Sequence, residues 1–231
     1  MKAVSGDLPK ALLPVGPRAF IDWQLQWLKR LGVTEAILAL GHGGKEIQAH
    51  LEKSPDRALF PALAYRFDGK EFLGTAGAIR NVADALADDF LVTYGDSFLF
   101  VRASDLFEAH RHAGKGVTFS IFHNKGAGDT SNVIFRNGGI VLYDKLKVTS
   151  AMDHIDYGMF AVRKKYFLEH VPPGKSDLAP FLTAASRAGE MAPFLAHEIF
   201  REIGSPAGYE GLRRLLEENG HDLARLEKRI Q

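Results

Sequence analysis

The sequence predicts an α/β fold in which a mixed, mainly parallel central sheet is extended by an antiparallel, hairpin-rich piece. In the first half, apolar runs typical of strands alternate with amphipathic helical stretches, which is the pattern of βα units with parallel strands. In the second half, short strands follow one another around turn sequences such as Asn137-Gly138-Gly139, which favour hairpins. No repeat or low-complexity tract interrupts the pattern.

Composition and charge limit the kinds of molecule that the protein is expected to bind. The 231 residues are 46% hydrophobic and 25% charged, as expected for one sizeable core, and 29 basic against 28 acidic residues give no tendency to bind nucleic acid or an anionic membrane. The sequence has no cysteine, which excludes disulfides and thiolate metal sites and fits a reducing cytoplasm. No apolar run approaches the ~18 residues of a membrane span. We expect a cytoplasmic protein that binds small molecules, not nucleic acid or membrane, with a homo-oligomer as an option.

The run from Phe90 to Tyr94 is apolar and is followed at once by Gly95 and Asp96. Such a run predicts a buried strand, and Asp96 then stands at the carboxyl end of the strand, where open α/β sheets bind ligands. The alternative is an ordinary Gly-Asp turn without a function.

Near the start, Lys10 lies in the stretch from Leu8 to Gly16, which contains two prolines. The prolines argue against a regular helix and predict an extended loop around the lysine. A lysine held in this way suits a phosphate group. The alternative is a solvated surface lysine.

Several regular elements are expected in the first half. Apolar residues from Phe20 to Leu31 recur at helical spacing and stop before Gly32, so the two tryptophans in this stretch are assigned to the core. Further strands are expected at 34–40 and 63–67, and a short helix at 45–51.

The stretch 68–77 reads Asp-Gly-Lys-Glu-Phe-Leu-Gly-Thr-Ala-Gly and precedes an apolar helical face. Glycines at a helix entrance let a ligand approach N–H groups that have no partner within the helix, so Gly74 and Thr75 are candidate binding residues. Thr75 acting as a plain helix cap is the alternative.

In the remaining chain, His110 and His112 fall on a helix from Ser104 to His112 and are interpreted as surface residues. Strands are expected at 116–124, 132–136, 140–145, 155–163 and 200–203, with helices at 176–187 and from 208 onward. Glu202 ends the last strand. Because Mg²⁺ binds one or two carboxylates together with substrate phosphates, Asp96 and Glu202 could hold a nucleotide-bound ion.

Taken together, these residues resemble the sugar-1-phosphate nucleotidyltransferases, and especially their heptose-1-phosphate guanylyltransferase-like branch. The resemblance runs from Leu8 to about Leu216. It rests on the order and spacing of these motifs: LPKALLPVG (8–16), FLGTAGAIRNV (72–82), VTYGDSF (92–98), SNVIF (131–135), YDK (143–145), IDYG (155–158) and EIGSP (202–206).

The resemblance implies a Rossmann-like three-layer α/β/α fold of the nucleotide-diphospho-sugar transferase type. It also implies that an NTP and a sugar 1-phosphate react to an NDP-sugar and pyrophosphate with Mg²⁺ or Mn²⁺, GTP and heptose 1-phosphate being one candidate pair. The resemblance further implies a role for each candidate residue. Lys10 would contact phosphate, Gly74 and Thr75 would border the nucleobase, and Asp96 and Glu202 would bind the metal. Asn132, Lys145 and Asp156 would bind the sugar phosphate. Glu202 stands where many relatives have aspartate.

We expect one domain, with a nucleotide-binding half at 1–115, a sugar-phosphate-binding half at 116–206 and C-terminal helices at 207–231. The family opens with a strand and a glycine-rich phosphate loop, and the resemblance begins just after them. Either the start was placed too far downstream or the chain is shortened, and the sequence does not decide between the two. We therefore expect the first strand to be missing and the chain as given to be a weak enzyme. Two other functions stay open: a catalytically impaired descendant that binds a nucleotide sugar or a partner, and a glycosyltransferase of related fold, although Gly95-Asp96-Ser97 lacks the Asp-x-Asp usual there.

Overall fold

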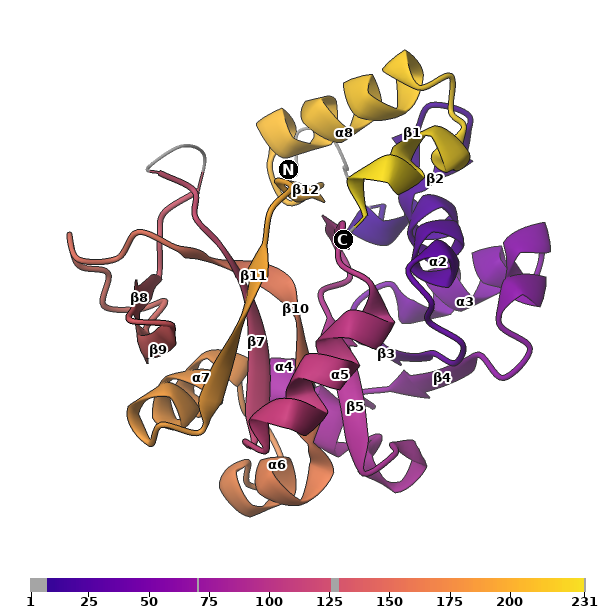
Figure 1. Cartoon of the computed structure of the whole chain (residues 1–231). Coiled ribbons are helices and arrows are strands. Elements are labelled where there is room, and N and C mark those ends of the chain that lie inside the picture. Colours follow the sequence, from indigo (N-terminus) through magenta and orange to yellow (C-terminus); the bar gives the residue numbers. More distant parts are fainter. Residues whose placement is uncertain (1–7, 70, 126–128, 231) are drawn as a thin grey trace. The chain divides into compact units, whose positions relative to one another are not determined.

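The computed structural model of the chain describes residues 8–69, 71–125 and 129–230 (Figure 1). The described chain forms two compact units, each assembled from separate stretches. Unit 1 comprises residues 8–67, 94–102 and 200–230, and unit 2 comprises residues 68–93 and 103–199. The expectation that a first strand is missing concerns the start of the chain and lies outside the described residues. The single domain with two halves stays a prediction.

Unit 1 contains short strands, three α-helices and several 3₁₀ helices, which are labelled η. In chain order they are η1 (Lys10–Leu12), β1 (Pro14–Val15), β2 (Arg18–Ala19), α2 (Phe20–Arg30), β3 (Ile37–Leu40), α3 (Gly44–Leu51), η2 (Pro55–Leu59), β4 (Ala64–Phe67), β6 (Ser97–Phe98), β12 (Arg201–Glu202), α8 (Pro206–Glu218) and η4 (Leu223–Arg229).

Helix α2 is the centre of unit 1 and confirms the prediction made from its apolar spacing. It buries Phe20, Leu25 and both tryptophans, and the chain turns away at Gly32, whose φ of 90° a residue with a side chain rarely adopts. The indole N–H groups of Trp23 and Trp27 donate to the carbonyl oxygens of Val15 (2.8 Å) and Leu99 (2.5 Å). Their assignment to the core is therefore confirmed.

The strands of unit 1 pair in two ways. Strands β3 and β4 are parallel and are connected through α3 and η2, as in a βα unit. Strands β6 and β12 are antiparallel, with Ser97 opposite Glu202 and Phe98 opposite Arg201. This second pairing joins two stretches that are about a hundred residues apart in the chain.

Unit 2 is built on a four-stranded sheet with helices packed against it. Its elements are α4 (Gly74–Arg80), η3 (Ala83–Ala85), β5 (Asp89–Thr93), α5 (Ala103–Ala113), β7 (Val117–Phe122), β8 (Val133–Arg136), β9 (Gly139–Tyr143), β10 (Ile155–Arg163), α6 (Lys164–His170), α7 (Leu178–Arg187) and β11 (Met191–Ala196).

The sheet of unit 2 has the order β11-β7-β10-β5, and α5 lies across β7 and β10 (Figure 1). The sheet is mixed, as predicted. It is not mainly parallel, however, because β11 and β7 are parallel while β10 runs antiparallel to both β7 and β5. The reason is the route of the chain: β10 follows the β8–β9 hairpin and not a helical crossover, which parallel neighbours require.

The β8–β9 hairpin confirms the predicted turn. Asn137 and Gly138 have φ values of 52° and 77°, the two positive values that a two-residue turn of type I′ needs. Helix α7 packs against β9 and thereby covers one side of this hairpin.

Two elements of unit 2 were not expected from the sequence, α6 and β11. Strand β11 contains Pro193, which lowers the strand propensity of its sequence. A proline is tolerated there because β11 is an edge strand of the sheet. None of the helices in the described part of the chain combines the length and apolar character that crossing a membrane requires.

The interpretation of His110 as a surface residue is wrong. Its side chain is fully buried, because Ala103, Leu106 and His110 form the face of α5 that meets the sheet. The Nδ1 atom of His110 is 2.9 Å from Thr118 Oγ1, and its Nε2 atom is 3.4 Å from a carboxylate oxygen of Asp89. Burial lowers the pKa of His110, although Asp89 acts in the opposite direction.

We predict that the stability of the protein falls as the pH drops below ~6.5, the usual pKa of an unfolded histidine. Because the folded pKa is lowered, the neutral imidazole stabilises the fold above that pH, and this contribution is lost as the unfolded state takes up a proton. Urea unfolding between pH 7.5 and 5 measures the effect. His110→Asn, which keeps a hydrogen-bonding atom near Thr118, should flatten the profile, whereas His112→Asn on the exposed side of α5 should not. An equal slope in both variants would contradict the assignment.

Candidate functional site

Asp96 lies in a tight turn at the end of the run that the sequence predicted to be a strand. Strand β5 ends at Thr93, and Gly95 and Asp96 form the turn that leads into β6. The carbonyl oxygen of Asp96 accepts a hydrogen bond from the N–H of Ile203 (3.0 Å), next to the pairing of Ser97 with Glu202. Main-chain contacts therefore hold the backbone of Asp96 beside that of Glu202.

The carboxylates of Asp96 and Glu202 approach the same point in front of Gly204. A Cβ atom built on Gly204 would lie 3.3 Å from Asp96 Oδ2 and 2.9 Å from Glu202 Oε2. Gly204 has no side chain to fill this space, so the structure brings together the two acids that the sequence assigned to a metal. Both are half-buried.

The carboxylate of Glu202 rests on the first turn of α8. Its Oε2 atom accepts hydrogen bonds from the N–H groups of Gly204 and of Ser205 (2.9 Å for Ser205), and its Oε1 atom accepts one from the Ser205 hydroxyl (2.5 Å). Ser205 is also the N-cap of α8, because its Oγ accepts from the N–H of Gly208 (3.0 Å).

This arrangement fits a hard cation such as Mg²⁺ or Mn²⁺. Among the described residues, no three His, Asp, Glu or Cys side chains form a metal site by themselves. Mg²⁺ commonly uses only one or two carboxylates and takes its other ligands from substrate phosphates and water. Each carboxylate oxygen has two lone pairs, so the hydrogen bonds to Glu202 leave acceptor capacity for an ion.

Lys10 also belongs to unit 1, but its surroundings differ from the expectation. The prolines do not hold it in an extended loop, because Lys10 begins the 3₁₀ helix η1 and its carbonyl oxygen accepts from Leu13 N–H (3.0 Å). Its side chain is exposed. The preceding Pro9 packs against Gly43, where a Cβ atom would lie 2.2 Å from the proline ring.

Gly74 and Thr75 open helix α4 in unit 2, where a nearby loop uses the first N–H groups of the helix. The N–H groups of Ala76 and Gly77 both donate to the carbonyl oxygen of Ser176 (3.0 Å each), and the N–H of Thr75 donates to Asp177 Oδ1 (3.3 Å). The N–H groups on which the sequence argument relied are therefore partnered within the protein. The contact with a nucleobase stays a prediction.

Thr75 is not the N-cap of α4. The helix begins at Gly74, its cap position is Leu73, and Thr75 Oγ1 accepts from the N–H of Leu178 at the start of α7 (2.8 Å). The threonine thus links the beginnings of two helices.

Asn132 and Asp156, both assigned to the sugar, lie next to each other in unit 2. The side-chain oxygen of Asn132 accepts from the N–H of Asp156 (2.9 Å), and Asp156 Oδ1 accepts from the N–H of Gly158 (2.9 Å). Asn132 is buried and Asp156 is half-buried. Burial, followed by the charges of Asp156 and Asp144, raises the pKa of the neighbouring Tyr143 far above that of a free phenol.

Lys145 follows β9 and its side chain is exposed. The acid beside it has a structural role: Asp144 Oδ1 accepts from the N–H groups of Lys147 (2.9 Å) and Leu146 (3.0 Å), while Oδ2 lies 3.3 Å from Arg187. The two amide hydrogen bonds and Arg187 lower the pKa of Asp144. Lys145 therefore projects from a turn that its neighbour stabilises.

Sequence reasoning did not identify the residues that hold Glu202, namely Ser205 and Gly208. A signal was present, because serine followed by proline is a common start of a helix, with the serine as N-cap and the proline in the first turn. It was not recognised because Glu202 was considered only as a metal ligand.

Comparison with known proteins identifies relatives over nearly the whole chain, although no protein-family profile matches it. A D-glycero-alpha-D-manno-heptose 1-phosphate guanylyltransferase of Campylobacter jejuni is 23% identical over 209 residues, which cover 90% of this chain and 91% of the relative. The enzyme of the same description from Aneurinibacillus thermoaerophilus is 22% identical over 219 residues, covering 94% and 93%.

Solved structures agree on the fold. HddC from Yersinia pseudotuberculosis, complexed with GMP-PN, superposes with a TM-score of 0.78 at 22% identity and covers 94% of this chain and 93% of its own. A putative glucose-1-phosphate thymidylyltransferase from Bacillus anthracis gives 0.75 at 16% identity, covering 92% and 91%.

Over nearly its whole length the chain is similar to sugar-1-phosphate nucleotidyltransferases. The resemblance stated from the motifs is thereby confirmed, and so is the Rossmann-like α/β fold class.

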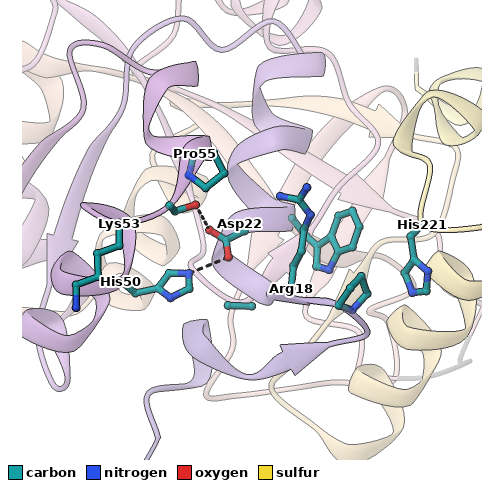
Figure 2. Close-up of a pocket in the computed structure, with 10 residues that line it drawn as sticks. Arg18, Asp22, His50, Lys53, Pro55 and His221 are labelled. Carbon is teal, nitrogen blue, oxygen red and sulfur yellow. Dashed lines mark hydrogen bonds and ion pairs between the residues drawn. The ribbon is translucent and has the colours of Figure 1, made fainter.

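A second polar region of unit 1 contains none of the predicted site residues. It surrounds a cavity of about 720 Å³ next to the start of α2, and Arg18, Asp22, His50, Lys53, Pro55 and His221 are among its lining residues (Figure 2). The carboxylate of Asp22 is in contact with His50 Nε2 (2.8 Å) and accepts from the Ser54 hydroxyl (2.7 Å).

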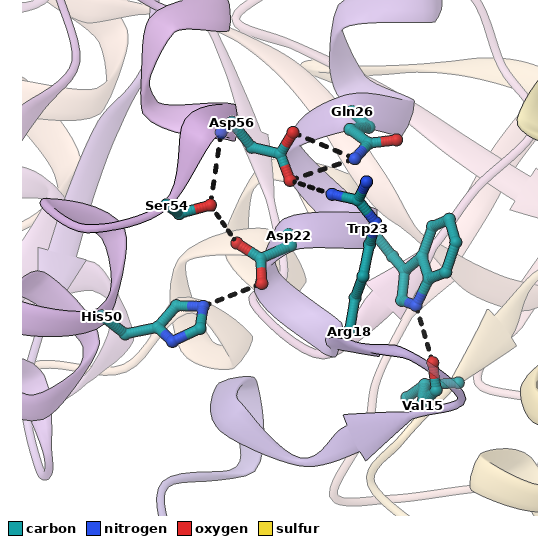
Figure 3. Close-up of polar contacts among 8 residues, drawn as sticks. All are labelled: Val15, Arg18, Asp22, Trp23, Gln26, His50, Ser54 and Asp56. Atoms are coloured by element: carbon teal, nitrogen blue, oxygen red, sulfur yellow. Dashed lines mark hydrogen bonds and ion pairs between the residues drawn. The ribbon is translucent and has the colours of Figure 1, made fainter.

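A neighbouring carboxylate is paired in the same way. Asp56 accepts from Arg18 (2.8 Å) and from the Gln26 side chain (3.0 Å to each oxygen), as Figure 3 shows. Both buried acids of this region therefore have partners within the protein, and the two groups of contacts connect α2 to α3 and η2. We interpret the region as a structural network.

We predict that Gly77→Ala destabilises the protein by about 1–3 kcal/mol, the usual cost of forcing an extra group into a packed site. A Cβ atom at this position would lie 2.4 Å from the carbonyl oxygen of Gly174, a main-chain atom with little room to move. Urea unfolding measures the change. Gly95→Ala is the matched control, since no atom lies within 4 Å of its Cβ position. A Gly77→Ala protein as stable as the control would show that the loop at 174–177 does not press on α4.

Proposed function

We propose that the chain catalyses nucleotidyl transfer from an NTP to a sugar 1-phosphate, giving an NDP-sugar and pyrophosphate. GTP and D-glycero-α-D-manno-heptose 1-phosphate are the first substrate pair to test, because two relatives that align over nine-tenths of the chain carry the corresponding description. A cytoplasmic location, where NTPs are available, is part of the same proposal.

The observation that carries the proposal is the approach of the Asp96 and Glu202 carboxylates to one point in front of Gly204. These two acids would hold Mg²⁺ or Mn²⁺, which would neutralise charge on the NTP phosphates. In the reaction, an oxygen of the sugar phosphate attacks the α-phosphorus of the NTP and the bond to the β-phosphate bridge oxygen breaks, so that pyrophosphate leaves. Positioning and charge neutralisation supply most of such catalysis, and no nucleophilic side chain is required.

The remaining residues have binding roles in the proposal. Lys10, whose ammonium group is exposed in unit 1, would contact phosphate. In unit 2, Gly74 and Thr75 would border the nucleobase, although the N–H of Thr75 itself donates to Asp177 Oδ1. The sugar phosphate would be bound in the same unit by Asn132, Asp156 and Lys145. The main-chain N–H of Asp156 donates to the side-chain oxygen of Asn132 and keeps the two residues adjacent, which supports a shared role in binding.

We predict that Asp96→Asn lowers kcat/KM at least a hundredfold and raises the Mg²⁺ concentration needed for half-maximal rate. The reason is that an amide keeps the shape of the carboxylate but not the charge that binds the ion. Pyrophosphate release, measured with several NTPs and sugar 1-phosphates, gives both quantities. Asp222→Asn is the control, since Asp222 is an exposed acid of unit 1 that caps η4 and asparagine caps a helix equally well. If Asp96→Asn turns over like Asp222→Asn, the metal assignment is wrong.

We also predict that Asp156→Ala raises KM for the sugar 1-phosphate at least tenfold and leaves KM for the NTP within about twofold. Loss of a group that contacts only one substrate raises the KM of that substrate alone. The side chain of Asn132 keeps its hydrogen bond in this variant, because it accepts from the main-chain N–H of residue 156. The measurement is steady-state kinetics with each substrate varied in turn, and Asp84→Ala on the exposed surface of η3 is the control. Equal changes in both KM values would contradict a sugar-side role.

A further inference from the structure

The carboxylate of Glu202 is folded back onto the start of helix α8. Hydrogen bonds reach it from two N–H groups and one hydroxyl, all from Gly204 and Ser205. The positive end of the α8 dipole lies at the same place and favours a negative charge there. The orientation of this carboxylate is thus set by the helix as well as by its own strand.

The close approach depends on Gly208. A Cβ atom on Gly208 would lie 1.7 Å from Glu202 Oε1 and 2.7 Å from the carbonyl oxygen of Glu202. Any side chain at position 208 would therefore displace the carboxylate or move the helix. The next glycine of α8 has no such role, since the Cβ position of Gly211 is 3.9 Å from its nearest neighbour, Arg201 Cδ.

Ser205 contributes more than a helix cap. A cap only has to accept a hydrogen bond from the first turn, which Ser205 does from Gly208 N–H (3.0 Å), and aspartate or asparagine would do this as well. The hydroxyl also donates to Glu202 Oε1 (2.5 Å), and an ionised carboxylate in its place could not donate. The hydrogen bond that the Ser205 hydroxyl donates therefore connects the helix cap to the Glu202 carboxylate.

The main chain supplies the third constraint. Ser97 pairs with Glu202, and Ile203 N–H donates to the carbonyl oxygen of Asp96. The two acids thus have fixed backbone positions, and only the direction of the longer Glu202 side chain remains to be set.

We propose that Ser205 and Gly208 are positioning residues that direct the Glu202 carboxylate toward Asp96 and so complete the cation site. The inference rests on the proposed function, because it assumes that this pair of acids holds the metal ion. It goes further in assigning the geometry of the site to the start of α8. It also explains how glutamate can serve at position 202: its additional methylene group lets the carboxylate reach the N–H groups of residues 204 and 205.

The test compares Gly208→Ala with Gly211→Ala. Both replace a glycine within α8 by alanine, so both raise helix propensity equally, by about 1 kcal/mol. The probe is Mn²⁺ alone, titrated while the thermal melting of the whole chain is followed, which yields an apparent dissociation constant without any turnover. We expect Gly208→Ala to raise this constant at least tenfold and Gly211→Ala to leave it within twofold.

A second pair of variants separates the hydroxyl from the cap. Ser205→Asp keeps the cap but replaces the donor by an acceptor, so it should weaken Mn²⁺ binding at least tenfold. Ser205→Thr keeps the hydroxyl and should bind like the unchanged protein. Asp96→Asn shows that the titration reports on this site, because it should abolish the response.

The outcomes are distinguishable. Apparent dissociation constants for Mn²⁺ that are unchanged in both Gly208→Ala and Ser205→Asp would overturn the positioning role. The role would also be overturned if the unchanged protein did not respond to Mn²⁺, or if the Asp96→Asn variant still responded. If Mn²⁺ binding behaves as expected but no NTP and sugar 1-phosphate yield pyrophosphate, the positioning role stands and the proposed function fails. If product forms while the variants bind Mn²⁺ normally, the function stands and the positioning role fails.

Discussion

The antiparallel pairing of β6 with β12 is the constraint on which the candidate cation site depends. It spans only Ser97–Phe98 and Arg201–Glu202, yet it joins the middle of the chain to its C-terminal part within one unit. A two-residue pairing is too short to be stable in isolation. It persists because its surroundings are buried: Phe98 stacks on Trp27 with ring centroids 5.0 Å apart, and Ile203 is fully buried. The core around α2 therefore stabilises the position of both acids.

Glycine has opposite consequences at two places in this structure. At Gly204 the absent side chain leaves space between two carboxylates, which is space that an ion and phosphate oxygens could use. At Gly74 and Gly77 the absent side chains are replaced by the main chain of residues 174–177, which packs directly on the start of α4. A glycine-rich helix entrance is compatible with either result, because the sequence specifies that something approaches closely but not what approaches.

The features that could be predicted from the sequence are those that depend on neighbouring residues in the chain. The strand before Gly95, the α2 helix and the turn at Asn137 depend on local sequence, and the structure has all three. Burial of His110 and the order of the sheet depend on partners far away in the chain, so no local pattern contains them. The pairing of Asp96 with Glu202 was predicted from the chemistry expected of a metal ion and not from any local pattern.

The side chains of the two acids are oriented in different ways. A short aspartate in a tight turn has few directions available, so Asp96 is oriented mainly by its backbone, which Ile203 holds. A glutamate has one more rotatable bond, and ordering it costs conformational entropy unless other groups fix it beforehand. The hydrogen bonds from residues 204 and 205 provide this fixation before any ligand arrives. A site in which one ligand is oriented by a turn and the other by a helix start needs no further carboxylate, because the phosphates of a bound nucleotide can supply the remaining oxygen ligands of the ion.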